Sequence, residues 1–98
     1  MLTGKQRAFL RGKANQIEVV AQIGKDGLSR SAVSGIGTAL KARELVKVRV
    51  LPNSGLDTRA ACDEVCAALD AEPVQTIGTI FVLFRQKDKD SAFELPKP

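Results

Sequence analysis

The segment Gly24-Lys25-Asp26-Gly27 encloses two charged residues between two glycines. Because glycine has no Cβ, the backbone N–H groups of such a turn can approach a ligand closely. The apolar run Val19–Ile23 before the segment predicts a strand, and Ser29 after it predicts a helix N-cap. The positive end of that helix favours an anion. Lys25 would add positive charge and Asp26 would offset part of it. The segment therefore predicts a phosphate-binding loop, with an ordinary strand-to-helix connection as the alternative.

Basic residues are concentrated in the first half of the chain. Residues 1–50 contain ten Lys/Arg and three Asp/Glu, a net charge of +7, whereas residues 51–98 have a net charge of −3. This asymmetry makes one part of the molecule attractive to a polyanion. KH domains clamp a nucleic-acid backbone with a glycine-bracketed loop of the same pattern. We expect the loop to share one surface with Arg7, Arg11 and Arg30. Lys5 lies further round the first helix and is a further candidate contact.

The sequence gives little support for a catalytic or metal site. The chain has no histidine, which rules out a Ser/His or Cys/His nucleophile. Cys62 and Cys66 alone cannot complete a tetrahedral zinc site. We interpret them as buried apolar side chains one helical turn apart, with a redox or metal role as the alternative. Neither a Walker sequence nor a dinucleotide fingerprint is present. The sequence predicts a non-enzymatic protein that uses no metal, cofactor or small-molecule substrate.

Composition limits the class of protein further. A chain of 98 residues with 44% hydrophobic residues predicts one domain with its own core, and we expect a monomer. No apolar run is long enough for a membrane span, and the first residues lack a signal-peptide apolar region. This predicts a cytoplasmic protein with no membrane partner. The four Phe are the only aromatic residues, which argues against stacking of successive bases on exposed rings.

Hydrophobic periodicity predicts three helices. Thr3 and Gln6 form a capping box that starts a helix over Gly4–Asn15. Ser29 starts a second helix, which has inward-facing residues as far as Leu40. Asp57 caps a third helix that ends near Leu69 or Ala71.

Four strands are predicted between and after these helices: Val19–Ile23, Val46–Val50, Val74–Ile77 and Ile80–Phe84. The last two form a hairpin around Gly78-Thr79. The strand Val46–Val50 alternates with a period of two, which gives one valine face and one basic face with Lys47 and Arg49. The order predicts a single α/β domain over residues 1–85, with helices covering a mixed sheet. Residues 86–98 are charged and are predicted to be a disordered tail.

Four separated segments of the chain, in the same order, resemble one protein family. They are Leu2–Arg7, Val20–Leu28, Glu44–Val48, and Ile77-Gly78 with Val82–Arg85. The family is the YhbY type, the stand-alone bacterial form of the CRM domain, an RNA-binding module. The resemblance runs from Leu2 to about Arg85. It implies a compact αβαβαββ domain with a mixed four-stranded sheet, similar to the C-terminal domain of a bacterial translation initiation factor.

The resemblance also implies a function and a site. The family's GxxG loop corresponds to Gly24, Lys25, Asp26 and Gly27, and its basic first helix corresponds to Lys5, Arg7 and Arg11. The implied role is in ribosome biogenesis, as an assembly factor that contacts the RNA of large-subunit precursors. The alternative is a protein-interaction module that docks on a ribosomal protein or another assembly factor. Double-stranded DNA binding is disfavoured, because no helix has the Arg/Asn/Gln set that recognises base edges.

Overall fold

The computed structural model describes all 98 residues, in the order αβαβαββ that the sequence predicts. The helices are α1 (Gly4–Ala14), α2 (Arg30–Arg43) and α3 (Thr58–Leu69). The strands are β1 (Val19–Ile23), β2 (Leu45–Val50), β3 (Glu72–Ile77) and β4 (Ile80–Phe84), and the 3-10 turn η1 (Pro52–Ser54) follows β2. No helix is long and apolar enough to cross a membrane.

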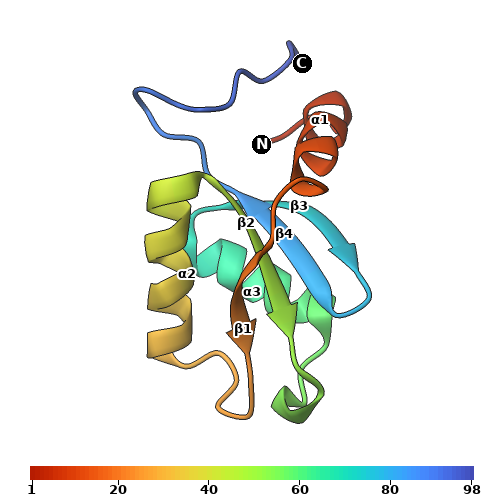
Figure 1. Cartoon of the computed structure of the whole chain (residues 1–98), viewed down its shortest axis with the longest axis vertical. Coiled ribbons are helices and arrows are strands. Elements are labelled where there is room, and N and C mark those ends of the chain that lie inside the picture. Colours follow the sequence, from red (N-terminus) through yellow and green to blue (C-terminus); the bar gives the residue numbers. More distant parts are fainter.

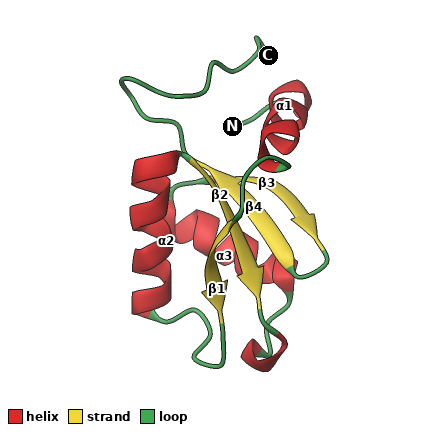
Figure 2. Ribbon diagram, viewed as in Figure 1, coloured by secondary structure: helices red, strands yellow, loops and turns green.

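The four strands form one mixed sheet in the order β1-β2-β4-β3. β1 pairs with β2 in parallel, while β4 pairs antiparallel with both β2 and β3. The parallel pair is joined by the crossover helix α2, as parallel strands require. Figures 1 and 2 show α2 and α3 on one face of the sheet and α1 at one end of the molecule, near both termini. The predicted mixed, helix-covered sheet is therefore confirmed.

The larger of two apolar clusters lies between the sheet and the helices α2 and α3. Val46, Val48 and Val50 point into it from β2, as the period-two pattern predicts. Cys62 and Cys66 are buried in the same cluster, at the inner face of α3. Lys47 and Arg49 alternate with these valines and belong to the opposite face of the sheet.

The smaller cluster lies on that opposite face, under α1. Leu10 and Ala14 of α1 pack there with Val82 and Phe84 of β4. Phe93, from the segment after the last strand, packs on the same cluster. The two faces of the sheet are thus covered by different parts of the chain, and α1 covers only one end of its face.

Side chains cap all three helices as the sequence predicts. At α1 the Thr3 hydroxyl accepts from the Gln6 N–H, and the Gln6 side chain accepts from the Thr3 N–H, both at 3.1 Å. At α2 the Ser29 hydroxyl accepts from the Ala32 N–H at 3.1 Å. Asp57 caps α3 in the same way. These local bonds fix where each helix begins.

Two glycines inside α2 have different surroundings. A Cβ on Gly37 would lie 3.1 Å from Leu69 Cδ2 of α3, whereas a Cβ on Gly35 would meet nothing within 4 Å. Gly37 therefore permits close packing of α2 against α3.

Residues 86–98 contain no helix or strand, but they contact the domain at several points. The ring of Phe93 packs edge-on against Phe84, with centroids 5.5 Å apart at 85°. The Gln6 side chain donates to the Pro96 carbonyl at 3.0 Å. We call residues 86–98 the C-terminal strap. Its predicted disorder stays a prediction about the molecule in solution, and the contacts supply a way to test it.

Candidate nucleic-acid interface

The GxxG loop (residues 24–27) is a tight turn at the end of β1. The Gly27 N–H donates to the Gly24 carbonyl at 2.9 Å, which closes the turn. Gly27 has a φ of +63°, a left-handed conformation that L side chains rarely adopt. Lys25 and Asp26 are exposed at the tip, and their own N–H groups have no partner within the protein. The loop therefore presents two free backbone donors and one mobile cation.

The segment after β2 supports this loop from one side. The Leu51 N–H donates to the Ile23 carbonyl at 2.9 Å, which extends the β1–β2 pairing to the edge of the loop. A Cβ on Gly24 would make ordinary contacts, 3.8 Å from Leu51 Cδ1 and 3.9 Å from Asn53 Oδ1. Packing alone thus does not require glycine at position 24. Close approach of a ligand to the backbone would explain a glycine at this position.

Arg30 is the predicted basic residue that the fold brings to the loop. It is the first residue of α2 and is exposed, three positions after Gly27. The unpaired N–H groups at the start of α2 add partial positive charge at the same place. The loop, the start of α2 and Arg30 are thus adjacent and make up a candidate anion-binding surface.

The fold does not bring α1 to this surface. In Figure 1 α1 lies at the top of the molecule and the connection between β1 and α2 at the bottom, along an axis of 39 Å. Lys5 and Arg11 are exposed on α1, while Arg7 is half-buried and its Nε donates to the Pro73 carbonyl at 3.1 Å. The fold therefore does not place α1 and the GxxG loop on one continuous surface. A role of Lys5, Arg7 and Arg11 in binding stays a prediction about a second, separate contact.

Comparison with known proteins shows which family the chain resembles. Residues 2–85 match the CRS1 / YhbY (CRM) domain. The chain belongs to this family. It is 40% identical to the "Probable RNA-binding protein YqeI" of Bacillus subtilis over 98% of this chain and 100% of the relative. It is 32% identical to the "RNA-binding protein" of Haemophilus influenzae over 98% and 96% of the two chains.

A solved structure matches this CRM-domain protein over almost its whole length. The solution structure of the hypothetical protein SAV1595 from Staphylococcus aureus has a TM-score of 0.84 and 38% identity, over 98% of this chain and 100% of that one. The two chains are therefore similar in sequence as well as in fold. The predicted family and architecture are both confirmed.

No Lys or Arg side chain of the CRM domain is paired with a carboxylate. The one ion pair in the structure joins the Met1 amine to Glu72 Oε1 at 3.3 Å, so none of the 15 Lys/Arg side chains forms an ion pair. A cation that is not paired internally keeps its full charge for an external anion. The basic side chains are thus available to a polyanion without the breaking of any internal ion pair.

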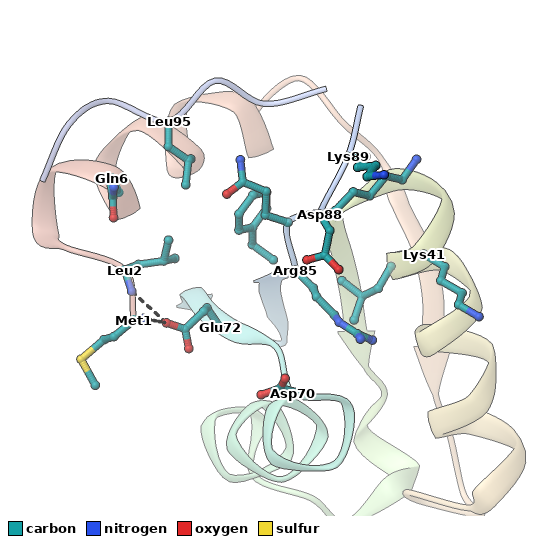
Figure 3. A pocket seen from close by; sticks show the side chains of 14 residues that line it. Met1, Leu2, Gln6, Lys41, Asp70, Glu72, Arg85, Asp88, Lys89 and Leu95 are labelled. Atoms are coloured by element: carbon teal, nitrogen blue, oxygen red, sulfur yellow. Dashed lines mark hydrogen bonds and ion pairs between the residues drawn. The ribbon is translucent and has the colours of Figure 1, made fainter. Parts of the chain in front are cut away.

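The largest cavity of this CRM domain, about 830 Å³, lies away from the loop. It opens between α1, the C-terminal strap and the ends of α2 and α3, and Figure 3 shows its charged lining. The lining includes Lys41, Arg85 and Lys89, but also Asp70 and Asp88, so neither sign of charge dominates. This mixture gives no selective site for an anion.

The two cysteines are buried in α3 and are not positioned for metal binding. No group of three or more His, Cys, Asp or Glu side chains in the structure could hold a metal ion. A hydrogen bond with Cys62, together with burial, raises the pKa of the Cys66 thiol well above its ordinary value. A thiol with a raised pKa is a poor nucleophile and a poor metal ligand at neutral pH.

Sequence reasoning missed Glu44, which is the one buried charged residue. It ends α2 with a φ of 68°, and its carboxylate accepts hydrogen bonds from the C-terminal strap. An acidic residue directly after Arg43 gives no local signal of burial. Its partners lie more than 40 positions away, so only the folded chain identifies them.

Proposed function

We propose that this CRM-domain protein binds RNA and acts as an assembly factor for the large ribosomal subunit, contacting precursor ribosomal RNA through the GxxG loop. The observation that carries the proposal is the loop itself, with two free backbone donors, an exposed Lys25 and the N-terminus of α2 converging on one place. The relatives named as RNA-binding proteins support the choice of ligand.

Phosphate contacts supply most of the affinity in this mechanism. The N–H groups of Lys25 and Asp26 donate to phosphate oxygens, while Lys25 and Arg30 add charge and release counterions. The Gly27 N–H closes the turn on the Gly24 carbonyl and leaves these two donors without a protein partner. Such contacts fix the position of a nucleic-acid backbone but carry no sequence information.

Base recognition contributes little. Phe81 and Phe84 are buried in the two clusters, and Phe9 and Phe93 are half-buried against the smaller one. No exposed ring remains on which a base could stack. We therefore expect affinity for large-subunit RNA that depends steeply on salt and weakly on local sequence.

Binding measured with a transcript of large-subunit ribosomal RNA tests the mechanism. Lys25→Gln should weaken binding about three- to tenfold and lower the slope of log affinity against log salt by about 1. Asp26→Asn should strengthen binding, because it removes a negative charge beside the phosphate. Lys41→Gln, an exposed cation in the last turn of α2, is the matched control and should change little.

Crosslinking in cells followed by sequencing of the attached RNA tests the biological role. The expected result is enrichment of large-subunit precursors that Lys25→Gln reduces. No enrichment of large-subunit RNA contradicts the assembly role. Affinity for a pre-ribosomal particle that salt leaves unchanged favours the alternative, a module that docks on a protein of that particle.

A further inference from the structure

Four residues form a row across all four strands, on the face of the sheet opposite α2 and α3. The strand register pairs Gln22 of β1 with Arg49 of β2, Arg49 with Ile80 of β4, and Ile80 with Ile77 of β3. Directly paired residues point to the same face, so these side chains lie side by side. With strands about 4.8 Å apart, the row is about 14 Å long.

No helix covers this end of the sheet. In Figure 2, α3 lies behind the sheet and no helix lies in front of the end that leads into the GxxG loop. Gln22 and Arg49 are exposed and Ile80 is half-buried. Ile77 is 60% exposed, which is unusual for a large apolar side chain on a sheet. At the other end of the same face, Val82 is buried beneath α1.

Exposed apolar side chains lie within the row, on β1 before it, and beside the loop. Apart from Met1 at the N-terminus, the structure exposes three large hydrophobic residues: Val20, Leu56 and Ile77. Val20 precedes Gln22 on β1 and alternates with the inward-facing Ala21. Leu56 Cδ1 lies 4.0 Å from the position of a Cβ on Gly27. Exposed apolar side chains near unpaired cations are typical of an interaction site.

Positive charge dominates this face. Its strand residues include two cations, Lys47 and Arg49, and one carboxylate, Glu72. Glu72 is at the α1 end and is already paired with the Met1 amine at 3.3 Å. The Lys47 ammonium donates to the Ile17 carbonyl at 3.2 Å, so Arg49 is the cation free for a ligand.

The row is continuous with the GxxG loop. Gln22 precedes Gly24 by two residues, and β1 runs directly into the loop. A nucleic-acid strand whose phosphate is held by the loop therefore has the row as its next surface. The two isoleucines by themselves would suit an apolar protein partner. The adjacent Arg49 and the loop favour a polyanion instead.

We propose that a single-stranded segment of RNA continues from the GxxG loop across this end of the sheet. The planar guanidinium of Arg49 binds a phosphate with two parallel hydrogen bonds. Ile77 and Ile80 contact the apolar faces of ribose and base, and the Gln22 amide donates and accepts at polar edges. This inference rests on the proposed function, because it extends the interface from the same loop.

Fluorescence anisotropy with labelled single-stranded RNA of about 4 and about 12 nucleotides tests the inference, since these lengths bracket the site of a small single-strand-binding domain. Arg49→Gln should weaken binding of the longer RNA about three- to tenfold and reduce its salt slope by about 0.7. Ile77→Ser should weaken it about threefold with the salt slope unchanged. Both side chains are exposed, so both variants should fold.

Two comparisons separate this inference from the proposed function. The short RNA should depend on Lys25 but not on Arg49 or Ile77, and Lys41→Gln should leave both RNAs unaffected. If Lys25→Gln weakens binding while Arg49→Gln and Ile77→Ser bind the longer RNA like the wild type, the sheet row is not part of the interface and only this inference fails. If the wild type binds the ribosomal RNA transcript but neither single-stranded RNA, this inference fails and the proposed function stands.

Discussion

The Glu44 carboxylate accepts a hydrogen bond from the Ala92 N–H at 2.7 Å, which joins the end of α2 to the C-terminal strap across 48 positions of sequence. The Lys87 N–H donates to the same carboxylate at 3.0 Å, and the Ser91 hydroxyl donates as well. Burial acts to raise the pKa of Glu44, but these hydrogen bonds outweigh it and hold the pKa below its ordinary value of 4.5. One buried charge thus fixes the strap to the domain.

This relationship predicts a specific dependence of stability on pH. The pKa of Glu44 is lower in the folded than in the unfolded chain, so its stabilisation is complete above about pH 4.5 and is lost as the pH falls towards the folded-state pKa. Glu44→Gln should lower the free energy of unfolding at pH 7 by about 2 kcal/mol and flatten its acid dependence. Urea denaturation at pH 7 and pH 4 measures both effects. Glu64→Gln, an exposed change on α3, is the control, and equal acid dependence in the wild type and Glu44→Gln would contradict the role of Glu44.

Phe93 provides an independent test of the strap. An edge-on aromatic pair contributes about 0.5–1.5 kcal/mol beyond the apolar area that it buries. Phe93→Ala should therefore lower the free energy of unfolding by about 1–2 kcal/mol, measured by urea titration. Glu94→Ala, an exposed neighbour, should have almost no effect. A strap that is disordered in solution would make the two variants indistinguishable.

The two glycines of α2 form a matched pair for measuring helix packing. Replacing glycine by alanine in an exposed helix stabilises it by about 0.5–1 kcal/mol. Gly35→Ala should show this full gain, because nothing lies near its new Cβ. Gly37→Ala should gain less or lose stability, because Leu69 Cδ2 would have to move from a distance of 3.1 Å. Thermal or urea denaturation measures the difference in stability between the two variants. Equal gains in stability would mean that Leu69 can move away from the new Cβ at no energetic cost.

The basic residues of α1 should behave differently from one another. Arg7→Gln should lower the free energy of unfolding by about 1 kcal/mol, because its Nε donates to the Pro73 carbonyl of β3. Arg11→Gln, at an exposed position, should leave stability unchanged. Because α1 is remote from the GxxG loop, Arg11→Gln should also reduce RNA affinity less than Lys25→Gln does. An equal loss would place α1 in the main RNA contact after all.

Local signals predicted most of the fold correctly. The capping residues Thr3, Ser29 and Asp57 mark their helices through bonds that span three positions, and the alternation in β2 identifies its buried face without further information. These features depend on residues a few positions apart. The helix starts and the buried face of β2 can therefore be predicted from short stretches of sequence.

Features that depend on distant parts of the chain were less accessible. The basic residues of α1 and the GxxG loop both belong to the basic half of the sequence. The number of charges in that half does not indicate that the fold separates them. The row from Gln22 to Ile77 draws one residue from each of four strands, so it exists only once the strand order is known. The proximity of Arg30 to the GxxG loop could be predicted, because the loop and α2 are consecutive in the chain.

The position of β2 in the sheet also has a consequence for the synthesis of the protein. β2 needs β1 on one side and β4 on the other, and β4 ends at Phe84 of a 98-residue chain. A nascent chain that has completed only β1, α2 and β2 exposes an unpaired edge of valine-rich strand. The sheet can close only after β4 has left the ribosome, so one edge of β2 stays unpaired until residue 84 has been synthesised and exposed.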